Sequence, residues 1–157
     1  MANAVVPVVF YRDPMAALTW LAAAFGFELS LLVTDQAGAV GHAEMTWRGA
    51  AIGVGGEWAS PELLGPARLK SPASLDGVGT QFVRIFLDGD IERHCEQARA
   101  AGARIVQEPK TQFYGDRTYR ALDLEGHVWN FAMAVTEVSV AEMEKASGLT
   151  FKTGANE

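Results

Sequence analysis

Apolar and polar positions along the first third of the chain change period in a regular order. Apolar, β-branched runs predict strands, whereas apolar residues at helical spacing predict one helix between them. The predicted elements are a strand over 5–11, a helix over 13–26, a strand over 27–33 and a hairpin of 42–47 with 50–55. Asp13 is a suitable N-cap for this helix, Pro14 suits its first turn, and Gly26 suits its end. The segment is therefore typical of a βαβββ unit.

The second half of the chain repeats this order of elements. Its predicted elements are a strand over 80–87, a helix over 90–102, a short strand over 103–109 and a hairpin within 117–135 that turns at Glu125-Gly126. The hairpin glycines, Gly49 and Gly126, lie 77 residues apart, and the helix-ending glycines, Gly26 and Gly102, lie 76 residues apart. A near-constant offset over four elements indicates an internal duplication, so we expect two βαβββ modules.

Two segments lie outside the repeat. Residues 57–79 contain three prolines and are typical of a long linker or a lid. Residues 138–149 predict a short tail helix, with Ser139 and Glu142 as a capping box. We therefore expect a single domain over residues 1–157, with module one at 5–56 and module two at 80–135.

Composition and charge narrow the class of protein. The chain has 157 residues, of which 49% are hydrophobic and 20% are charged, as in globular proteins with a full core. A net charge of −6 disfavours a nucleic-acid partner, because phosphate binding needs clustered Lys and Arg. No run approaches the roughly 20 apolar residues of a membrane span, and the first residues lack the basic start of a signal peptide. With Cys95 as the single cysteine, no intrachain disulfide can form, and we expect a cytoplasmic protein.

Alternation within each hairpin predicts which side chains share a face, provided that both turns contain two residues. In the first hairpin, one face carries His42, Glu44, Thr46, Ala51, Gly53 and Gly55, and the other carries Met45, Trp47, Ala50 and Ile52. In the second hairpin, one face carries Arg117, Tyr119, Ala121, Val128, Asn130 and Ala132, and the other carries Leu122, Trp129 and Phe131. The more apolar set must pack on the helices, so we expect the small and polar set to line a concave face that a ligand can reach.

These features resemble the glyoxalase/bleomycin-resistance superfamily, whose members are also called vicinal oxygen chelate proteins. The segment "VVPVVFYRDPMAALTWLAAAFGF" is similar to the opening strand, "RD" and helix of that family, and "YGDRTYRALDLEGHVWNF" is similar to its closing hairpin. Over residues 5–135 the resemblance implies an α+β fold of tandem βαβββ modules, whose curled mixed sheet surrounds a cleft. Pro7-Val8 in the first strand and the run from Gly115 to Tyr119 resemble the bleomycin-resistance branch, which implies a homodimer.

The resemblance also implies a divalent metal in the cleft, held by one residue from the first strand and one from the last strand of each module. In this chain those positions are Val6, Gly53, Phe82 and Asn130. Three of them offer no ligating side chain, and Asn130 offers only a neutral oxygen, so we predict no metal and no cofactor. The alternative is a displaced metal site built on His42 and Glu44 with Tyr119 or Asn130. Otherwise His42 and Glu44 are solvated, or they pair with Arg84.

Arginine and aromatic side chains are the candidate ligand contacts. Arg84 is expected to anchor a carboxylate, phosphate or enolate in the cleft, or else to form an ion pair with Glu44. Arg117 could act in the same way, or it could pair with Asp116 or Asp123. The full set of candidate ligand-binding residues is Phe10, His42, Glu44, Trp58, Phe82, Arg84, Phe86, Tyr114, Arg117, Tyr119 and Asn130.

The remaining candidates for chemistry are expected to be structural or solvated. His127 follows the second turn on the helix side and should be structural, whereas His94 lies on the charged side of its helix and should be solvated. Cys95 should be a buried small hydrophobe rather than a nucleophile.

The sequence favours a binding protein over an enzyme. We expect metal-free binding of a small, aromatic organic molecule, with sequestration of a drug or a toxic metabolite as in antibiotic resistance. The alternative is a glyoxalase-like lyase or isomerase, or a ring-cleaving dioxygenase, with a displaced metal. In a metal-free enzyme, Glu44 or His42 would act as the general base and Arg84 would hold the enolate. A third hypothesis is a structural or regulatory partner whose cleft is closed by Phe82 and Phe86.

Overall fold

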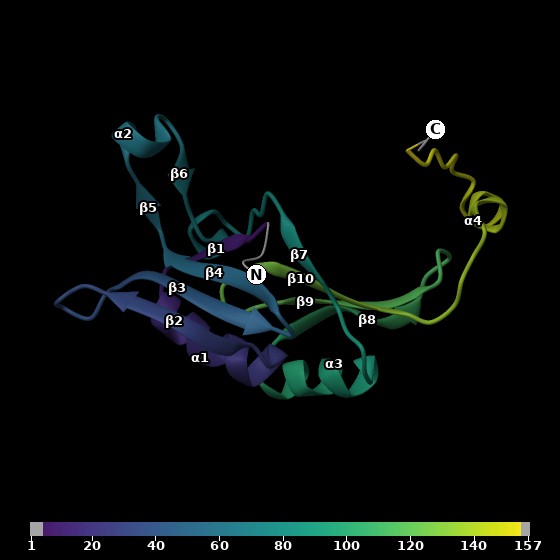
Figure 1. The fold of residues 1–157 in the computed structure, drawn as a ribbon, viewed down its shortest axis with the longest axis horizontal. Coiled ribbons are helices and arrows are strands. Elements are labelled where there is room, and N and C mark those ends of the chain that lie inside the picture. The colour runs from purple at the N-terminus through teal and green to yellow at the C-terminus, as the bar shows by residue number, and fades with distance from the viewer. Residues whose placement is uncertain (1–4, 155–157) are drawn as a thin grey trace.

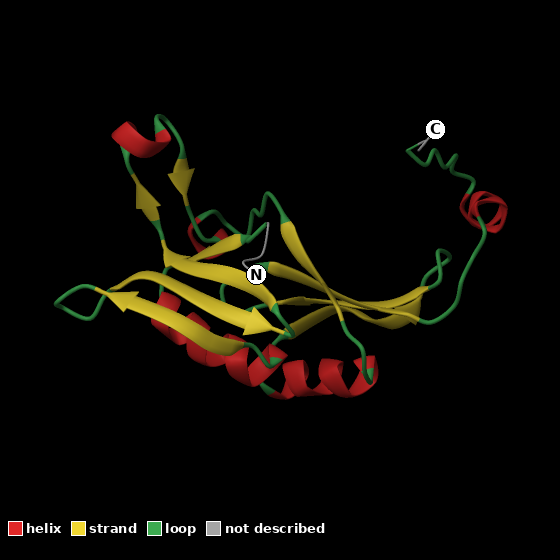
Figure 2. Cartoon of the chain, viewed as in Figure 1, coloured by secondary structure: helices red, strands yellow, loops and turns green. Residues whose placement is uncertain are grey.

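Each half of the chain folds as a four-stranded mixed sheet with one helix packed on it (Figure 1). The computed structural model describes residues 5–154. The strand order is β1-β4-β3-β2 in module one and β7-β10-β9-β8 in module two. The two helices of the modules cover the same side of the sheets (Figure 2). The tandem βαβββ fold predicted from the sequence is thereby confirmed.

Module one consists of β1 (Val8–Tyr11), α1 (Pro14–Phe25), β2 (Glu28–Thr34), β3 (Val40–Trp47) and β4 (Ala50–Gly56). The helix begins after Asp13, whose side chain accepts a backbone hydrogen bond, and it ends at Gly26 in the left-handed conformation. Strands β3 and β4 are joined by the two-residue turn Arg48-Gly49, whose φ angles of 47° and 82° are typical of a type I′ turn. Glu44 consequently lies opposite Gly53, as predicted.

Module two consists of β7 (Phe82–Phe86), α3 (Ile91–Ala100), β8 (Arg104–Thr111), β9 (Asp116–Leu122) and β10 (Val128–Ala134). Its last two strands are joined by a longer loop, residues 123–127, and not by a two-residue turn at Glu125-Gly126. The longer loop shifts the pairing by one residue, so Tyr119 lies opposite Phe131. The predicted faces of β9 are therefore wrong, because a one-residue shift moves every side chain of a strand to the other face.

Asp123 explains the length of this loop. Its buried carboxylate accepts hydrogen bonds from the Tyr11 hydroxyl at 2.7 Å and from Trp129 Nε1 at 3.0 Å. It also accepts hydrogen bonds from the backbone amides of Glu125 and His127 within the loop. Burial, followed by the charge of Asp123, raises the pKa of the Tyr11 hydroxyl, so the hydroxyl stays a neutral donor. The loop is thus folded around one acceptor that also holds two side chains of the core.

The same loop ties module two to the start of module one. The Glu125 carboxylate accepts hydrogen bonds from the amides of Arg12 and Asp13 at 2.8 and 3.0 Å. His127 Nε2 lies 2.7 Å from the Phe10 carbonyl oxygen. His127 therefore has the structural role that its position after the turn predicted.

The two modules share one apolar core beneath the sheets. Phe25, at the end of α1, packs with its ring centroid 4.8 Å from that of Phe131 and 5.3 Å from that of Trp129. His94 of α3 belongs to this core, because its Nδ1 lies 2.7 Å from the Tyr119 hydroxyl and its Nε2 lies 3.1 Å from the Phe25 carbonyl oxygen. The prediction that His94 is solvated is wrong, since its side of α3 faces the end of α1 rather than water. Burial lowers the pKa of His94 and favours the neutral ring.

The segment between the modules forms β5 (Trp58–Ala59), α2 (Pro61–Leu64), β6 (Arg68–Leu69) and the 3-10 helix η1 (Pro72–Ser74). Strands β5 and β6 pair into an arm that extends away from the sheets (Figure 1). The chain after this arm is docked on the body, because the amide of buried Ser71 donates to Glu57 at 2.9 Å and its hydroxyl donates to Glu125 at 2.8 Å.

The tail forms α4 (Val140–Ser147), within the predicted segment 138–149. The capping box between Ser139 and Glu142 is present, as predicted. None of the residues of α4 is buried, and the helix projects beyond the end of module two (Figure 1). No helix among the described residues has the length and apolar character that crossing a membrane requires.

Candidate functional site

Polar, small and aromatic side chains, with some aliphatic ones, lie on the side of the sheets turned away from α1 and α3, which we call the open face. Module one contributes Val8, Phe10, His42, Glu44, Gly53 and Gly55, and module two contributes Phe82, Arg84, Phe86, Thr118, Arg120, Leu122, Val128, Asn130 and Ala132. The intervening residues of these strands, such as Val9, Met45 and Trp129, are buried under the helices. Leu122, which was expected on the helix side, thus lies on the open face because of the shifted pairing.

In module one, the chain itself covers the two glycines of the open face. A Cβ atom at Gly53 would lie 2.9 Å from a Val8 methyl group, and one at Gly55 would lie 3.2 Å from the Phe10 ring. Phe10 therefore packs over the glycine floor of its own sheet. His42 Nε2 and Glu44 Oε1 lie 3.4 Å apart beside this floor, and both side chains are more than two-fifths exposed.

The residues at the position of the family's metal do not fit a metal ion. The strand next to Gly53 presents Val8, rather than Val6, as its direct neighbour, and Asn130 has Arg84, rather than Phe82, as its neighbour. Tyr119 cannot complete a displaced site with His42 and Glu44, because its side chain lies in the core on the helix side. Across residues 5–154, no three His, Cys, Asp or Glu side chains come together in a way that could hold a metal.

In module two, three polar side chains form a row across three strands. Asn130 of β10 lies between Arg84 of β7 and Arg120 of β9, with each arginine directly opposite it in the pairing. Asn130 is 3% exposed, and its Oδ1 atom is buried without a hydrogen-bond partner among the described residues. A buried polar atom that lacks a partner costs free energy, so its presence here indicates a position shaped for something other than stability.

The two arginines of this row differ in their partners. Arg84 Nη2 donates to Asp116 Oδ2 at 2.6 Å, and its guanidinium lies 4.8 Å from the Phe86 ring centroid and 5.9 Å from that of Tyr114. Asp116, and not Glu44, is therefore the ionic partner of Arg84. Arg120 is exposed and forms no ion pair with any residue in the described range 5–154. A guanidinium carries five N–H donors, so both arginines have donors left for a ligand.

Aromatic side chains border the row at its Arg84 end. Phe82 and Phe86, on the edge strand β7, are 54% and 57% exposed, so they do not close a cavity of the chain as the third hypothesis requires. Tyr114 packs edge to face with Phe113, their ring centroids 5.2 Å apart, next to Arg84. Trp58 lies on β5, in the arm that projects away from the sheets, and therefore not beside this row (Figure 1).

Two of the predicted ligand contacts are elsewhere. Arg117 donates to Glu92 of α3 on the helix side, and Tyr119 is fully buried and stacked on Phe131 with 4.9 Å between ring centroids. Burial raises the pKa of the Tyr119 hydroxyl, which keeps it protonated beside His94. Both predictions are wrong for the same reason, since the longer loop moves the odd-numbered residues of β9 to the helix side.

Arg120 is the functional candidate that the sequence alone did not identify. The signal that could have found it is the turn: "DLEGH" starts with an aspartate that can accept the amides two and four residues later, which is typical of a longer loop. Cys95, in contrast, is buried as predicted. Burial raises the pKa of its thiol to about 11, so it is a poor nucleophile.

Fold and open face together define the class of protein. The chain belongs to the Glyoxalase/Bleomycin resistance protein/Dioxygenase superfamily, whose family model matches residues 4–131. No curated protein matches the sequence. The family match ends before α4, so the tail lies outside the part that the family model describes.

Solved structures agree with this membership. TioX from Micromonospora sp. ML1 is 29% identical, with a TM-score of 0.64, and the match covers 85% of this chain and 100% of TioX. A glyoxalase/bleomycin resistance protein/dioxygenase family enzyme from Burkholderia phytofirmans is 19% identical, with a TM-score of 0.60, over 85% of this chain and 100% of that one. The fosfomycin resistance protein FosX from Listeria monocytogenes is 12% identical, with a TM-score of 0.57, over 91% and 98%. The last two show a common fold and nothing finer.

Proposed function

We propose that this protein binds a small organic molecule on the open face of module two without using a metal. The observation that carries this proposal is the row of Arg84, Asn130 and Arg120, where the family's metal-ligand position holds an asparagine whose direct neighbours on both adjacent strands are arginines. Such a row recognises a carboxylate, a phosphonate or another strong acceptor. The half-exposed rings of Phe82 and Phe86 on β7 offer apolar contact for the rest of the ligand.

The role that follows from binding without chemistry is sequestration. A protein of this family that holds a drug or a toxic metabolite needs affinity and no reacting group. Homodimer formation fits the exposure of β7 and β2, whose outward apolar side chains include Leu29 and Leu31 at 51% and 43% exposure. Light scattering on the purified chain tests whether it forms a dimer. We propose that the protein acts in the cytoplasm.

The rival function is a metal-dependent lyase, isomerase or dioxygenase. It draws support from His42 and Glu44, which lie 3.4 Å apart on the open face of module one. Structural neighbours include FosX complexed with Mn(II) and a sulfate ion, although at 10% identity that match concerns the fold alone. Against it stands the missing third ligand, since a tetrahedral or octahedral site needs at least three protein donors.

Isothermal titration with naphthoate, a flat aromatic carboxylate, tests the proposal. Arg120→Gln keeps the size and polarity of the side chain and removes its charge, so naphthoate affinity should fall by about tenfold or more. Arg93→Gln, which changes an exposed arginine of α3 on the other side of the molecule, is the matched control and should bind as the parent does. Equal affinity of the Arg120 variant and the parent would contradict the proposal.

A further inference from the structure

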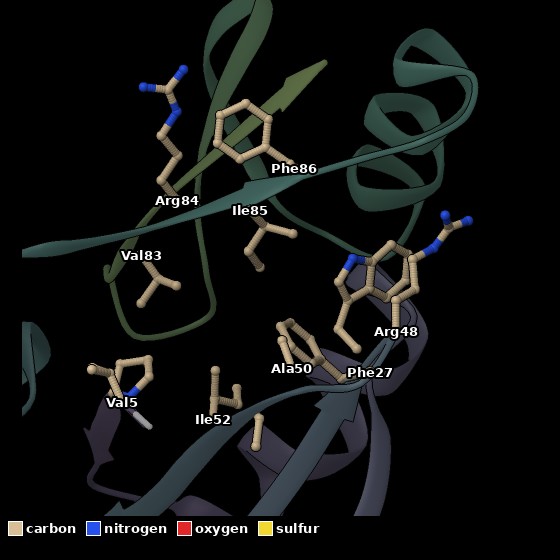
Figure 3. A pocket seen from close by; sticks show the side chains of 12 residues that line it. Val5, Phe27, Arg48, Ala50, Ile52, Val83, Arg84, Ile85 and Phe86 are labelled. Atoms are coloured by element: carbon tan, nitrogen blue, oxygen red, sulfur yellow. The ribbon is translucent and has the colours of Figure 1, made fainter. Parts of the chain in front are cut away.

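A second candidate site lies between the modules, on the other side of β7 from the arginine row. A cavity of about 360 Å³ is bounded by the start of β4 and the segment before β1 on one side and by β7 on the other. Its apolar walls come from Val5, Phe27, Ile52, Val83 and Ile85 (Figure 3). This volume lies within the range of small-molecule pockets, at its lower end. We call it the inter-module cavity.

The inter-module cavity and the open-face row lie on opposite sides of β7. In Figure 3, Val83 and Ile85 point towards Ile52, whereas Arg84 and Phe86 point the other way. This alternation is that of any strand, in which successive side chains leave from opposite faces. Arg84 and Phe86 border the cavity from the strand, but the Arg84 guanidinium is turned to Asp116 on the open face. A molecule in the cavity would therefore not occupy the row.

The wall of the cavity contains a hydrogen-bond donor without an acceptor. Trp47 lines the cavity, and its Nε1 atom is buried and has no partner among residues 5–154. Indole nitrogens inside proteins nearly always donate a hydrogen bond, so this one is an exception that a bound acceptor would remove. The ring of Trp47 also packs with that of Phe27, which gives a flat ligand an aromatic wall.

The charge at the cavity favours a ligand with an anionic group. Among the described residues that line it, Arg48 contributes a positive charge and none contributes a carboxylate, while the Arg84 guanidinium is turned to the open face. The Arg48 guanidinium lies 5.2 Å from the centroid of the Trp47 ring. It pairs through Nη1 with Asp88, and the remaining N–H groups of the planar guanidinium stay available.

We propose that the inter-module cavity binds a flat, apolar molecule that carries a carboxylate or a similar acceptor. The acceptor takes the hydrogen bond of Trp47 Nε1, while the apolar body fills the space between Ile52 and Val83. Because β4 belongs to module one and β7 to module two, the ligand contacts both modules and stabilises their association. This site is independent of the function proposed for the open face.

Naphthoate titration of four proteins tests this site separately from the arginine row. Ala50 is exposed and borders the cavity, so Ala50→Phe fills the cavity from its rim without disturbing the core. Ala59→Phe, at an exposed alanine of β5, is the matched control. The parent and the Ala59 variant should each bind two naphthoates. The Ala50 variant should lose the naphthoate in the inter-module cavity, and the Arg120→Gln variant should lose the one on the open face.

Trp47→Phe addresses the hydrogen bond directly. It keeps an aromatic ring and removes the N–H donor, so affinity at the inter-module cavity should fall about tenfold while the open-face site is unchanged. Two full-affinity equivalents in the Ala50 variant, or an unchanged affinity in the Trp47 variant, would overturn the cavity proposal. If the parent binds one naphthoate that only Arg120→Gln removes, the cavity proposal fails and the open-face function stands. If only Ala50→Phe removes the single bound naphthoate, the open-face function fails and the cavity proposal stands.

Discussion

The hairpins of the two modules share the same alternation of apolar and polar residues, but they differ in which side chains of the first strand face the open side. In module one, Arg48-Gly49 makes a two-residue turn, and the polar side chains of β3 lie where alternation predicts them. In module two, a loop built on Asp123 shifts the pairing, so Arg120 and Thr118 reach the open face instead of Arg117 and Tyr119. Strand periodicity alone thus fixes which residues share a face, and the turn decides which face that is.

Removal of the Asp123 carboxylate should have the largest effect on the difference between the two hairpins. Asp123→Ala leaves the Tyr11 hydroxyl and Trp129 Nε1 buried without an acceptor, and it frees two loop amides. The free energy of unfolding should fall by about 3 kcal/mol or more. Chemical denaturation followed by tryptophan fluorescence measures this change.

Asp35 provides the matched control for that variant. It also accepts two backbone amides within a hairpin loop, those of Ala37 and Ala39, but it lies exposed at the tip of module one. Asp35→Ala should cost no more than about 1 kcal/mol, because water replaces the lost acceptor. Similar losses in both variants would mean that Asp123 does not hold the longer loop.

The face of β9 is tested by a smaller change. Tyr119→Phe removes the hydroxyl that lies 2.7 Å from His94 Nδ1, so the free energy of unfolding should fall by about 1–2 kcal/mol. Tyr114→Phe, next to Arg84 on a surface loop, should have almost no effect on stability. If Tyr119 instead lined the open face, its variant would resemble the Tyr114 variant and would weaken ligand binding.

Some features of the fold could be predicted from the sequence, and others could not. The helices, their caps at Asp13 and Gly26, and the duplication depend on local chemistry and periodicity, and all of them are present in the structure. The strand pairing in module two depends on the hydrogen bonds that Asp123 accepts from Tyr11, which is distant in sequence, and from Trp129, which lies on the partner strand. Alternation of apolar and polar residues within one strand could not reveal these contacts.

The candidate site was predictable only in part. Arg84 and Asn130 lie on strands whose faces the repeat defined correctly, and both reach the open face. Arg120 was hidden by the shift in β9, and the burial of His94 depends on how α3 meets the end of α1, a contact between modules. Sequence patterns report faces within one module better than contacts between two.

The smallest expected effect concerns pH and the core that the modules share. Burial lowers the pKa of His94 in the folded state, so protonation favours the unfolded chain. The stability that neutral His94 provides is complete above its unfolded pKa of about 6.5, and it is lost as the pH falls towards the lower folded value. His94→Gln should therefore flatten the decline in unfolding free energy between about pH 7 and pH 5.

The central claim is that the open face binds an acidic organic ligand through Arg84, Asn130 and Arg120 and needs no metal. The most direct measurement is the metal content of protein purified without chelator, together with thermal unfolding after addition of Mn²⁺, Ni²⁺, Zn²⁺, Fe²⁺ or naphthoate. We predict substoichiometric metal, no stabilisation by any of the four ions relative to an EDTA-treated control, and a higher melting temperature with naphthoate, with a smaller rise in Arg120→Gln and no rise when Arg120→Gln is combined with Ala50→Phe. Stoichiometric metal, or stabilisation by an ion that His42→Ala and Glu44→Ala remove, would contradict this account and establish a displaced metal site.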